Sequence, residues 1–213
     1  MTVHEFDGLA EAARAFGARH AVEEGRHSEG GKADGVQEGL PTGIRLKLGV
    51  AAVGEIGGLA GGDAKCQAAA DAANLDGTFK AWLSFGLDTP ETRFTNLDNA
   101  GPYRLVANGS DGGNPPPKVA DNFADLFTCG SGTCLDNAIS RDENGGTPPT
   151  PQLVWTGTEA NGTAAADTCS GWTSTLVNGL GGVNSGTTES WTDFGVATAC
   201  TSEGRLYCFQ QAI

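Results

Sequence analysis

Apolar and polar residues alternate over several short segments of this chain, and one segment between them has helical periodicity. Two-residue alternation is typical of strands with one buried face. It predicts strands over residues 44–53, 78–84, 103–106, 153–158 and 205–210. In the second of these, Phe79, Ala81 and Leu83 share one face, which leaves Trp82 on the other. The segments between the strands are rich in Gly, Pro, Asn and Thr, so long loops are expected.

A helix is expected to begin at Asp63, whose carboxylate would cap free backbone N–H groups. Residues spaced at i, i+3, i+4 and i+7 give it one apolar face. These are Cys66, Ala69, Ala70 and Ala73. Cys66 should therefore point inward, and the helix should end at Asn74 or Gly77. A second short helix is predicted over residues 119–127.

Composition divides the chain into two regions. Residues 1–42 contain one short helical pattern followed by a polar, Gly-rich stretch without aromatic residues. Such a sequence predicts a flexible or partly helical extension. Residues 43–213 contain the predicted strands and helices, and this region is expected to fold as one domain.

Six cysteines are the strongest chemical signal in the sequence, and all of them follow residue 65. They are Cys66, Cys129, Cys134, Cys169, Cys200 and Cys208. An even number within one Gly-rich acidic region is typical of a disulfide framework in a secreted or cell-surface protein. Reduced, buried cysteines of a cytosolic protein are the alternative. A zinc site does not fit the spacing, because there is no Cys-x-x-Cys pair and all three histidines lie within the first 27 residues. The first residues also lack the apolar core of a signal peptide.

The chain is acidic, with a formal net charge of −13. From Leu59 onward it contains 7 Lys and Arg against 17 Asp and Glu. Such a surface repels the phosphates of nucleic acids and of anionic lipids, so neither is an expected partner. Divalent cations, neutral glycans and basic proteins are compatible with it. No run of about 18 apolar residues occurs, so no membrane insertion is expected.

Three segments carry a resemblance to a known family. Residues 57–84 read GGLAGGDAKCQAAADAANLDGTFKAWLS, residues 152–174 read QLVWTGTEANGTAAADTCSGWTS, and residues 196–210 read VATACTSEGRLYCFQ. In order and spacing they resemble the first helix and strand, the central strand with its Asn-Gly turn, and the closing cysteine pair of endostatin-like domains. Those are the C-terminal domains of certain collagens. The chain looks closest to a group of bacterial proteins of unknown function that share this pattern.

The resemblance implies an α+β, C-type-lectin-like fold. It would contain two short helices, small mixed or antiparallel sheets and long loops, stabilised by disulfides. The resemblance also implies that Cys66 pairs with Cys208 and Cys169 with Cys200. Cys129 and Cys134 would then close a small loop peculiar to this chain. The residues alone do not choose among the pairings that six cysteines allow.

Calcium is the one cofactor for which the sequence contains candidate ligands. Sugar-binding members of the wider lectin fold hold calcium in motifs such as Trp-Asn-Asp, and the nearest match is Trp191-Thr192-Asp193. A hydroxyl is a poorer calcium ligand than the amide that it replaces. Trp191 as a core residue and Asp193 as a solvated loop acid are therefore the favoured reading. A second candidate for a calcium site is a group of acids in one Gly- and Asn-rich stretch. The alternative interpretation is that these acids are ordinary solvated residues of surface loops. The group consists of Asp121, Asp125, Asp136, Asp142 and Glu143.

These observations favour a binding module over an enzyme. Residues 43–213 contain no histidine and no Gly-x-Ser-x-Gly motif, so no catalytic residue is proposed. We expect recognition of an extracellular protein or glycan through the loops over residues 108–145 and 173–192. Trp82 would be an exposed platform for a ligand, or else a buried residue under the loops. A structural domain of a matrix or envelope protein is the alternative function, and a hydrolase with paired carboxylates is a third. The oligomeric state is not indicated.

Overall fold

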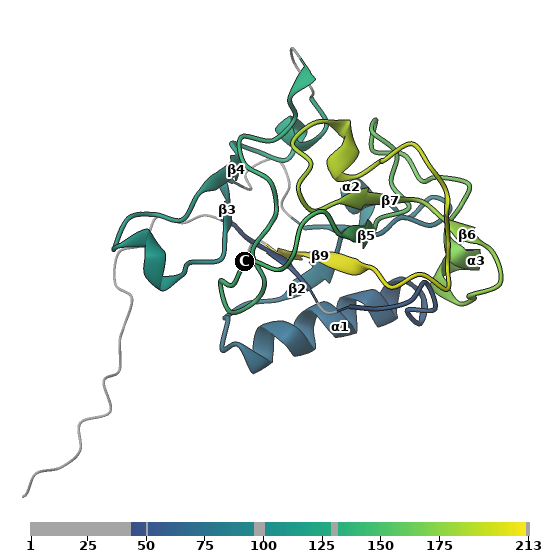
Figure 1. The fold of residues 1–213 in the computed structure, drawn as a ribbon, viewed down its shortest axis with the longest axis horizontal. Coiled ribbons are helices and arrows are strands. Elements are labelled where there is room, and N and C mark those ends of the chain that lie inside the picture. Colours follow the sequence, from purple (N-terminus) through teal and green to yellow (C-terminus); the bar gives the residue numbers. More distant parts are fainter. Residues whose placement is uncertain (1–43, 50, 96–100, 129–131, 212–213) are drawn as a thin grey trace, which may run out of the picture. The chain divides into compact units, whose positions relative to one another are not determined.

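The computed structural model describes residues 44–49, 51–95, 101–128 and 132–211 (Figure 1). The chain separates into two units, Met1–Glu38 and Gly39–Ile213, and only the second contains described residues. The predicted extension over residues 1–42 lies outside the described residues.

The described residues form a mixed α+β domain built on a seven-stranded sheet. Its order is β4–β3–β1–β9–β5–β7, and β2 also pairs with β9. The strand β9 (Arg205–Gln210) therefore lies at the centre (Figure 1). The other strands are β1 (Ile44–Leu48), β2 (Phe79–Ala81), β3 (Tyr103–Leu105), β4 (Lys118–Ala120), β5 (Leu153–Trp155) and β7 (Gly181–Val183).

Both faces of this sheet are buried, and β9 shows it most clearly. Leu206 and Cys208 belong to one core cluster, together with residues of the helix α1 (Gly58–Ala72). Tyr207 and Phe209 belong to a second cluster on the other face. Alternate residues of a strand point to opposite faces, so a strand that is apolar at every position indicates two cores. In Figure 1, α1 lies against the β2 and β9 side of the sheet.

The helix α1 begins five residues earlier than predicted, at Gly58. Asp63 is therefore not its cap. The Oδ1 atom of Asp63 accepts hydrogen bonds from Ala81 N (2.9 Å) and from Arg93 Nη2 (2.6 Å), and so ties the helix to β2 and α2 (Pro90–Arg93). The predicted end is right: Asn74 adopts φ +54, a left-handed conformation common just past a helix end.

The second predicted helix, over residues 119–127, is wrong. The segment contains the strand β4 and then a single 3-10 turn, Ala124–Leu126. The physical reason lies in the preceding prolines: Leu105 N donates to Pro117 O (3.0 Å), so the chain enters this region extended and pairs with β3. The predicted strands over residues 44–53, 78–84 and 153–158 exist but are shorter, and the strand over residues 205–210 is right.

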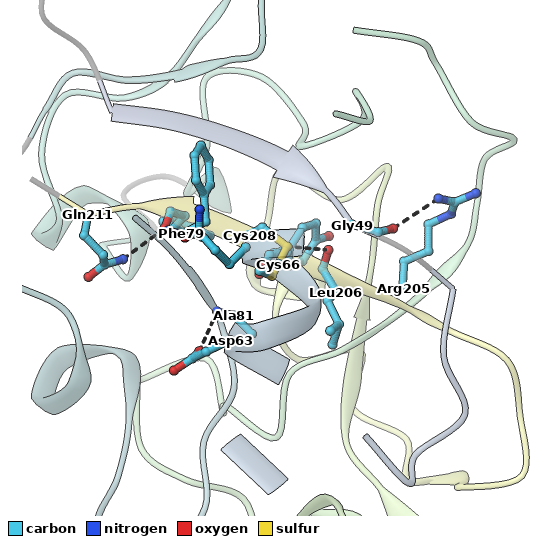
Figure 2. Close-up of a disulfide and its surroundings, with 12 residues drawn as sticks. Gly49, Asp63, Cys66, Phe79, Ala81, Arg205, Leu206, Cys208 and Gln211 are labelled. Atoms are coloured by element: carbon cyan, nitrogen blue, oxygen red, sulfur yellow. Dashed lines mark hydrogen bonds between the residues drawn. A yellow bond between two sulfur atoms is a disulfide. The ribbon is translucent and has the colours of Figure 1, made fainter. Parts of the chain in front are cut away.

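Two disulfides between described residues brace the domain. Cys66–Cys208 joins α1 to β9 across 142 residues (Figure 2). Cys169–Cys200 joins α3 (Cys169–Trp172) to the end of β8 (Thr198–Ala199) across 31 residues. These are the two pairs that the resemblance implied. Cys129 lies outside the described residues, so its expected bridge to Cys134 is not described. None of the helices in the described part of the chain has the length and hydrophobicity needed to cross a membrane.

Candidate functional site

The two tryptophans that we considered as ligand contacts are both buried. This agrees with the favoured core reading of Trp191, and it decides for Trp82 against the exposed ligand platform. Trp82 has no exposed surface and packs against Phe94, Phe209 and Trp191. Trp191 is equally buried, and its Nε1 atom donates to Leu126 O (3.2 Å). Trp82 faces the second core cluster of the sheet, because that face is covered rather than open to solvent. Neither ring can stack on a ligand.

The Trp191-Thr192-Asp193 motif is built for packing, not for calcium. Thr192 is buried, and its hydroxyl accepts from Trp82 Nε1 (3.0 Å) and donates to Thr158 O (3.1 Å). The hydroxyl therefore acts both as a donor and as an acceptor inside the core. Asp193 is partly exposed, and its Oδ1 accepts from Gly195 N (2.8 Å), which shapes a turn.

The five acids proposed as a calcium group do not come together at one point. Asp121 and Asp136 both bind Lys118 Nζ, at 2.6 and 2.9 Å. The hydrogen bonds from Lys118 to these carboxylates raise its pKa. Asp125 accepts instead from Asn122 Nδ2 (3.0 Å).

Asp142 and Glu143 lie in a separate turn. Asp142 Oδ1 accepts from Asn144 N (3.0 Å) and Gly146 N (2.7 Å), so its oxygen closes the turn. Glu143 instead acts on Lys47: burial lowers the pKa of Lys47, and the negative charge of Glu143 offsets part of that lowering. Within the described residues, no three His, Cys, Asp or Glu side chains gather where a metal ion could be held. The sequence predicted one site because these residues are close in the chain, but the loops distribute them over three places.

Two segments of the loop region pair with each other and form a ribbon on the surface. At its centre, β6 (Asn178–Gly179) pairs antiparallel with β8. Backbone hydrogen bonds continue the pairing on either side: Cys200 N donates to Val177 O, and Phe194 N donates to Gly181 O, each at 2.9 Å. We call residues 176–181 together with 194–200 the apolar ribbon.

The apolar ribbon carries large apolar side chains that face solvent. Their exposed fractions are 92% for Leu176, 43% for Val177, 57% for Phe194 and 59% for Val196. Monomeric proteins seldom expose several such residues in one place without a partner. The first segment of the ribbon, residues 176–181, spans five residue steps, which is roughly 17 Å in an extended strand. That length suits a short peptide segment or one edge of a protein.

The apolar ribbon rests on a rigid support. A Cβ atom placed on Gly179 would lie 2.6 Å from Cys169 Sγ and 3.1 Å from the Trp155 ring, so the ribbon backbone sits directly on the disulfide and the core. The support includes α3, which lies beside β6 (Figure 1). Its residues Cys169, Ser170, Gly171 and Trp172 all have φ between +53 and +69, a left-handed turn. Such backbone costs free energy at non-glycine residues and persists only where the surroundings impose it. Here the disulfide and the buried Trp172 impose it.

A hollow of about 510 Å³ lies beside Phe194. Glu189 and Asp193 line it together with Thr188 and Ser190. Glu189 is exposed, and none of the described residues that line this hollow is cationic. The ribbon therefore places an apolar surface next to a negatively charged hollow.

The charged side chains of the whole segment from Asp142 to Gly204 are all negative. It contains seven acids and no Lys, Arg or His. The cations that flank it in sequence are already engaged. Arg141 binds Asp111 at 2.8 Å, and Arg205 binds Gln152 Oε1 at 2.7 Å and Gly49 O at 3.1 Å.

Two other hollows on the domain are less suited to a partner. One, of about 490 Å³, is lined by Phe123, Phe127 and Asn161 among others. There the Phe127 ring stacks against Gly162 and Trp82, so its faces are covered. The other, of about 450 Å³, surrounds Arg205, which is engaged as above.

Sequence reasoning named the loop over residues 173–192 but missed the four apolar residues that carry the ribbon. Leu176 and Val177 form an apolar pair and Phe194 a single apolar residue in polar loops, and no periodicity marks them. The available signal was the absence of basic residues over residues 142–204 combined with these few apolar positions in polar loops. A comparison with known protein families and with curated proteins finds no match for this chain.

Proposed function

We propose that this protein is a non-catalytic binding module of the extracellular space or the cell surface, and that it recognises a protein partner through the apolar ribbon. We propose a C-type-lectin-like, endostatin-like fold for it. The bridge from the first helix to the last strand and the central position of β9 support this fold. The two disulfides support an oxidising compartment.

One observation carries the function: exposed apolar side chains lie on a braced ribbon. Leu176 and Phe194 are fixed relative to each other by backbone pairing and by the Cys169–Cys200 bridge. A preorganised apolar surface loses little conformational entropy on binding, so its burial is available for affinity. The buried centre of a protein interface is more apolar than its rim, and phenylalanine is enriched there.

A protein fits this surface better than a glycan does. Sugar rings stack best on exposed tryptophan or tyrosine, yet the four tryptophans and both tyrosines are buried. The ribbon presents aliphatic side chains and one phenylalanine, which match the apolar centre of a protein interface.

The test is a selection of phage-displayed random peptides on the oxidised full chain. We expect peptides that bind the wild type to be lost on the double variant Leu176→Ser/Phe194→Ser. The matched control is Leu87→Ser, because Leu87 is also 92% exposed but lies on the Phe85–Asp88 turn. Peptides retained equally by both variants, or no enrichment at all, would contradict the proposal.

The alternative of a structural module makes a different prediction. Its exposed apolar residues would bury each other in self-association, so sedimentation would show oligomers that Leu176→Ser/Phe194→Ser dissociates. A monomer at all concentrations, combined with peptide binding, favours the binding module.

A further inference from the structure

The described residues that line the hollow beside the apolar ribbon include two acids and no Lys or Arg. Glu189 and Asp193 line the hollow beside Phe194. The chain supplies no cation between residues 142 and 204. Of the two flanking cations, Arg141 forms an ion pair with Asp111, and Arg205 donates hydrogen bonds to Gln152 and Gly49. Bound apolar side chains would therefore lie in a negative field that nothing in the segment neutralises.

We infer that the apolar ribbon and its acidic hollow bind a cationic polypeptide, in which apolar side chains alternate with Lys or Arg. This inference rests on the proposed function and adds the chemical class of the partner. Apolar side chains of the partner cover Leu176, Val177, Phe194 and Val196. A Lys or Arg next to them enters the hollow and pairs with Glu189 and Asp193.

The geometry of the hollow fits such a cation. Its volume of about 510 Å³ exceeds that of one Lys or Arg side chain, so the group enters with its hydration shell partly in place. Glu189 is exposed, so a cation reaches it from solvent, while Asp193 keeps its turn through a single oxygen. Complementary charge raises the association rate and selects among partners, whereas the apolar contacts determine how long the complex lasts.

The test measures the affinity of the oxidised full chain for synthetic peptides by fluorescence anisotropy. The probes are a Leu/Lys peptide and a Leu/Gln peptide of equal length and apolar content. We expect the Leu/Lys peptide to bind at least tenfold more tightly at low ionic strength, and added salt to narrow this difference.

Matched variants identify the residues involved. Leu176→Ser and Phe194→Ser should each weaken Leu/Lys binding about tenfold, as expected for an interface anchor, and Leu87→Ser should not. Glu189→Gln/Asp193→Asn should remove most of the preference for the Leu/Lys peptide. Asp76→Asn, which neutralises an exposed acid elsewhere, should leave it unchanged.

The outcomes separate the two proposals. Equal binding of both peptides, with sensitivity to Leu176→Ser and Phe194→Ser, would overturn the cationic partner but leave the binding surface. Leu/Lys binding that Asp76→Asn weakens as much as Glu189→Gln/Asp193→Asn would show only diffuse attraction to an acidic chain and would also overturn it. Binding that is insensitive to Leu176→Ser and Phe194→Ser, or no binding of either peptide, would overturn the proposed function as well.

Discussion

Lys47 is a buried cation whose charge the folded protein tolerates poorly. It lies on β1 opposite Cys208 of β9, and it has no exposed surface. Its Nζ atom has no hydrogen-bond partner among the described residues and lies 5.4 Å from the centre of the Phe79 ring. Burial lowers the pKa of Lys47 from 10.5 to about 8, although Glu143 and Asp71 act in the opposite direction.

The size of the effect follows from this difference in pKa. Each unit corresponds to about 1.4 kcal/mol, so keeping Lys47 charged in the folded state costs about 3 kcal/mol below pH 8. The folded pKa is the lower one, so between about pH 8 and pH 10.5 the unfolded chain holds a proton that the folded protein has released. The free energy of unfolding should therefore rise with pH, by about 2 kcal/mol between roughly pH 7.5 and pH 10. Burial raises the pKa of Tyr103 and Tyr207, which favours unfolding at higher pH, so the measurement stops near pH 10.

The assay is urea unfolding of the oxidised chain over this pH range. Lys47→Met should abolish the rise and stabilise the protein at pH 7 by about 2–3 kcal/mol, while Lys65→Met should retain it. Glu143→Gln removes a negative charge that stabilises the protonated amine of Lys47. In this variant the free energy of unfolding should therefore begin to rise at a lower pH. A wild-type curve that runs parallel to that of Lys47→Met would refute the reasoning.

The remaining predictions concern the supports of the ribbon and the acidic loops. Cys169→Ser/Cys200→Ser opens a 31-residue span and should lower the free energy of unfolding by about 4 kcal/mol in urea; an unchanged midpoint would count against the bracing role. Thr192→Val leaves Trp82 Nε1 without its acceptor and should cost about 1–3 kcal/mol by the same assay, whereas the exposed Thr201→Val should be neutral. Lys118→Met leaves two carboxylates uncompensated, so calcium should raise the melting temperature of this variant by a few degrees more than that of the wild type; equal shifts would contradict this.

The sequence predicted best the elements whose pattern is local. β9 has the predicted bounds because its apolar run ends in polar residues on both sides, and the face of α1 that carries Cys66 is correct because helical spacing defines it. Trp82 was uncertain for a physical reason. Alternation separates the two faces of a strand, but it does not tell whether a second layer covers the other face. The uninterrupted apolar run of β9, from Leu206 to Phe209, is the signal that could have predicted two cores.

The candidate site was less predictable because it depends on tertiary pairing. Leu176 and Phe194 are 18 positions apart, and only the pairing of β6 with β8 and the bridge at Cys200 bring their segments together. The prediction of a calcium site at the acidic group was wrong for the converse reason. Asp121 and Asp125 are neighbours in sequence, but one binds Lys118 and the other binds Asn122. Spacing within a loop does not define a site unless the loop's own hydrogen bonds are known.

Methyl NMR spectra of the oxidised full chain, recorded with and without the Leu/Lys peptide, test the central claim most directly. The account predicts shifts at the methyl groups of Leu176, Val177 and Val196, with Leu87 unchanged. Shifts centred on Leu87, or spread evenly over the domain, would contradict it.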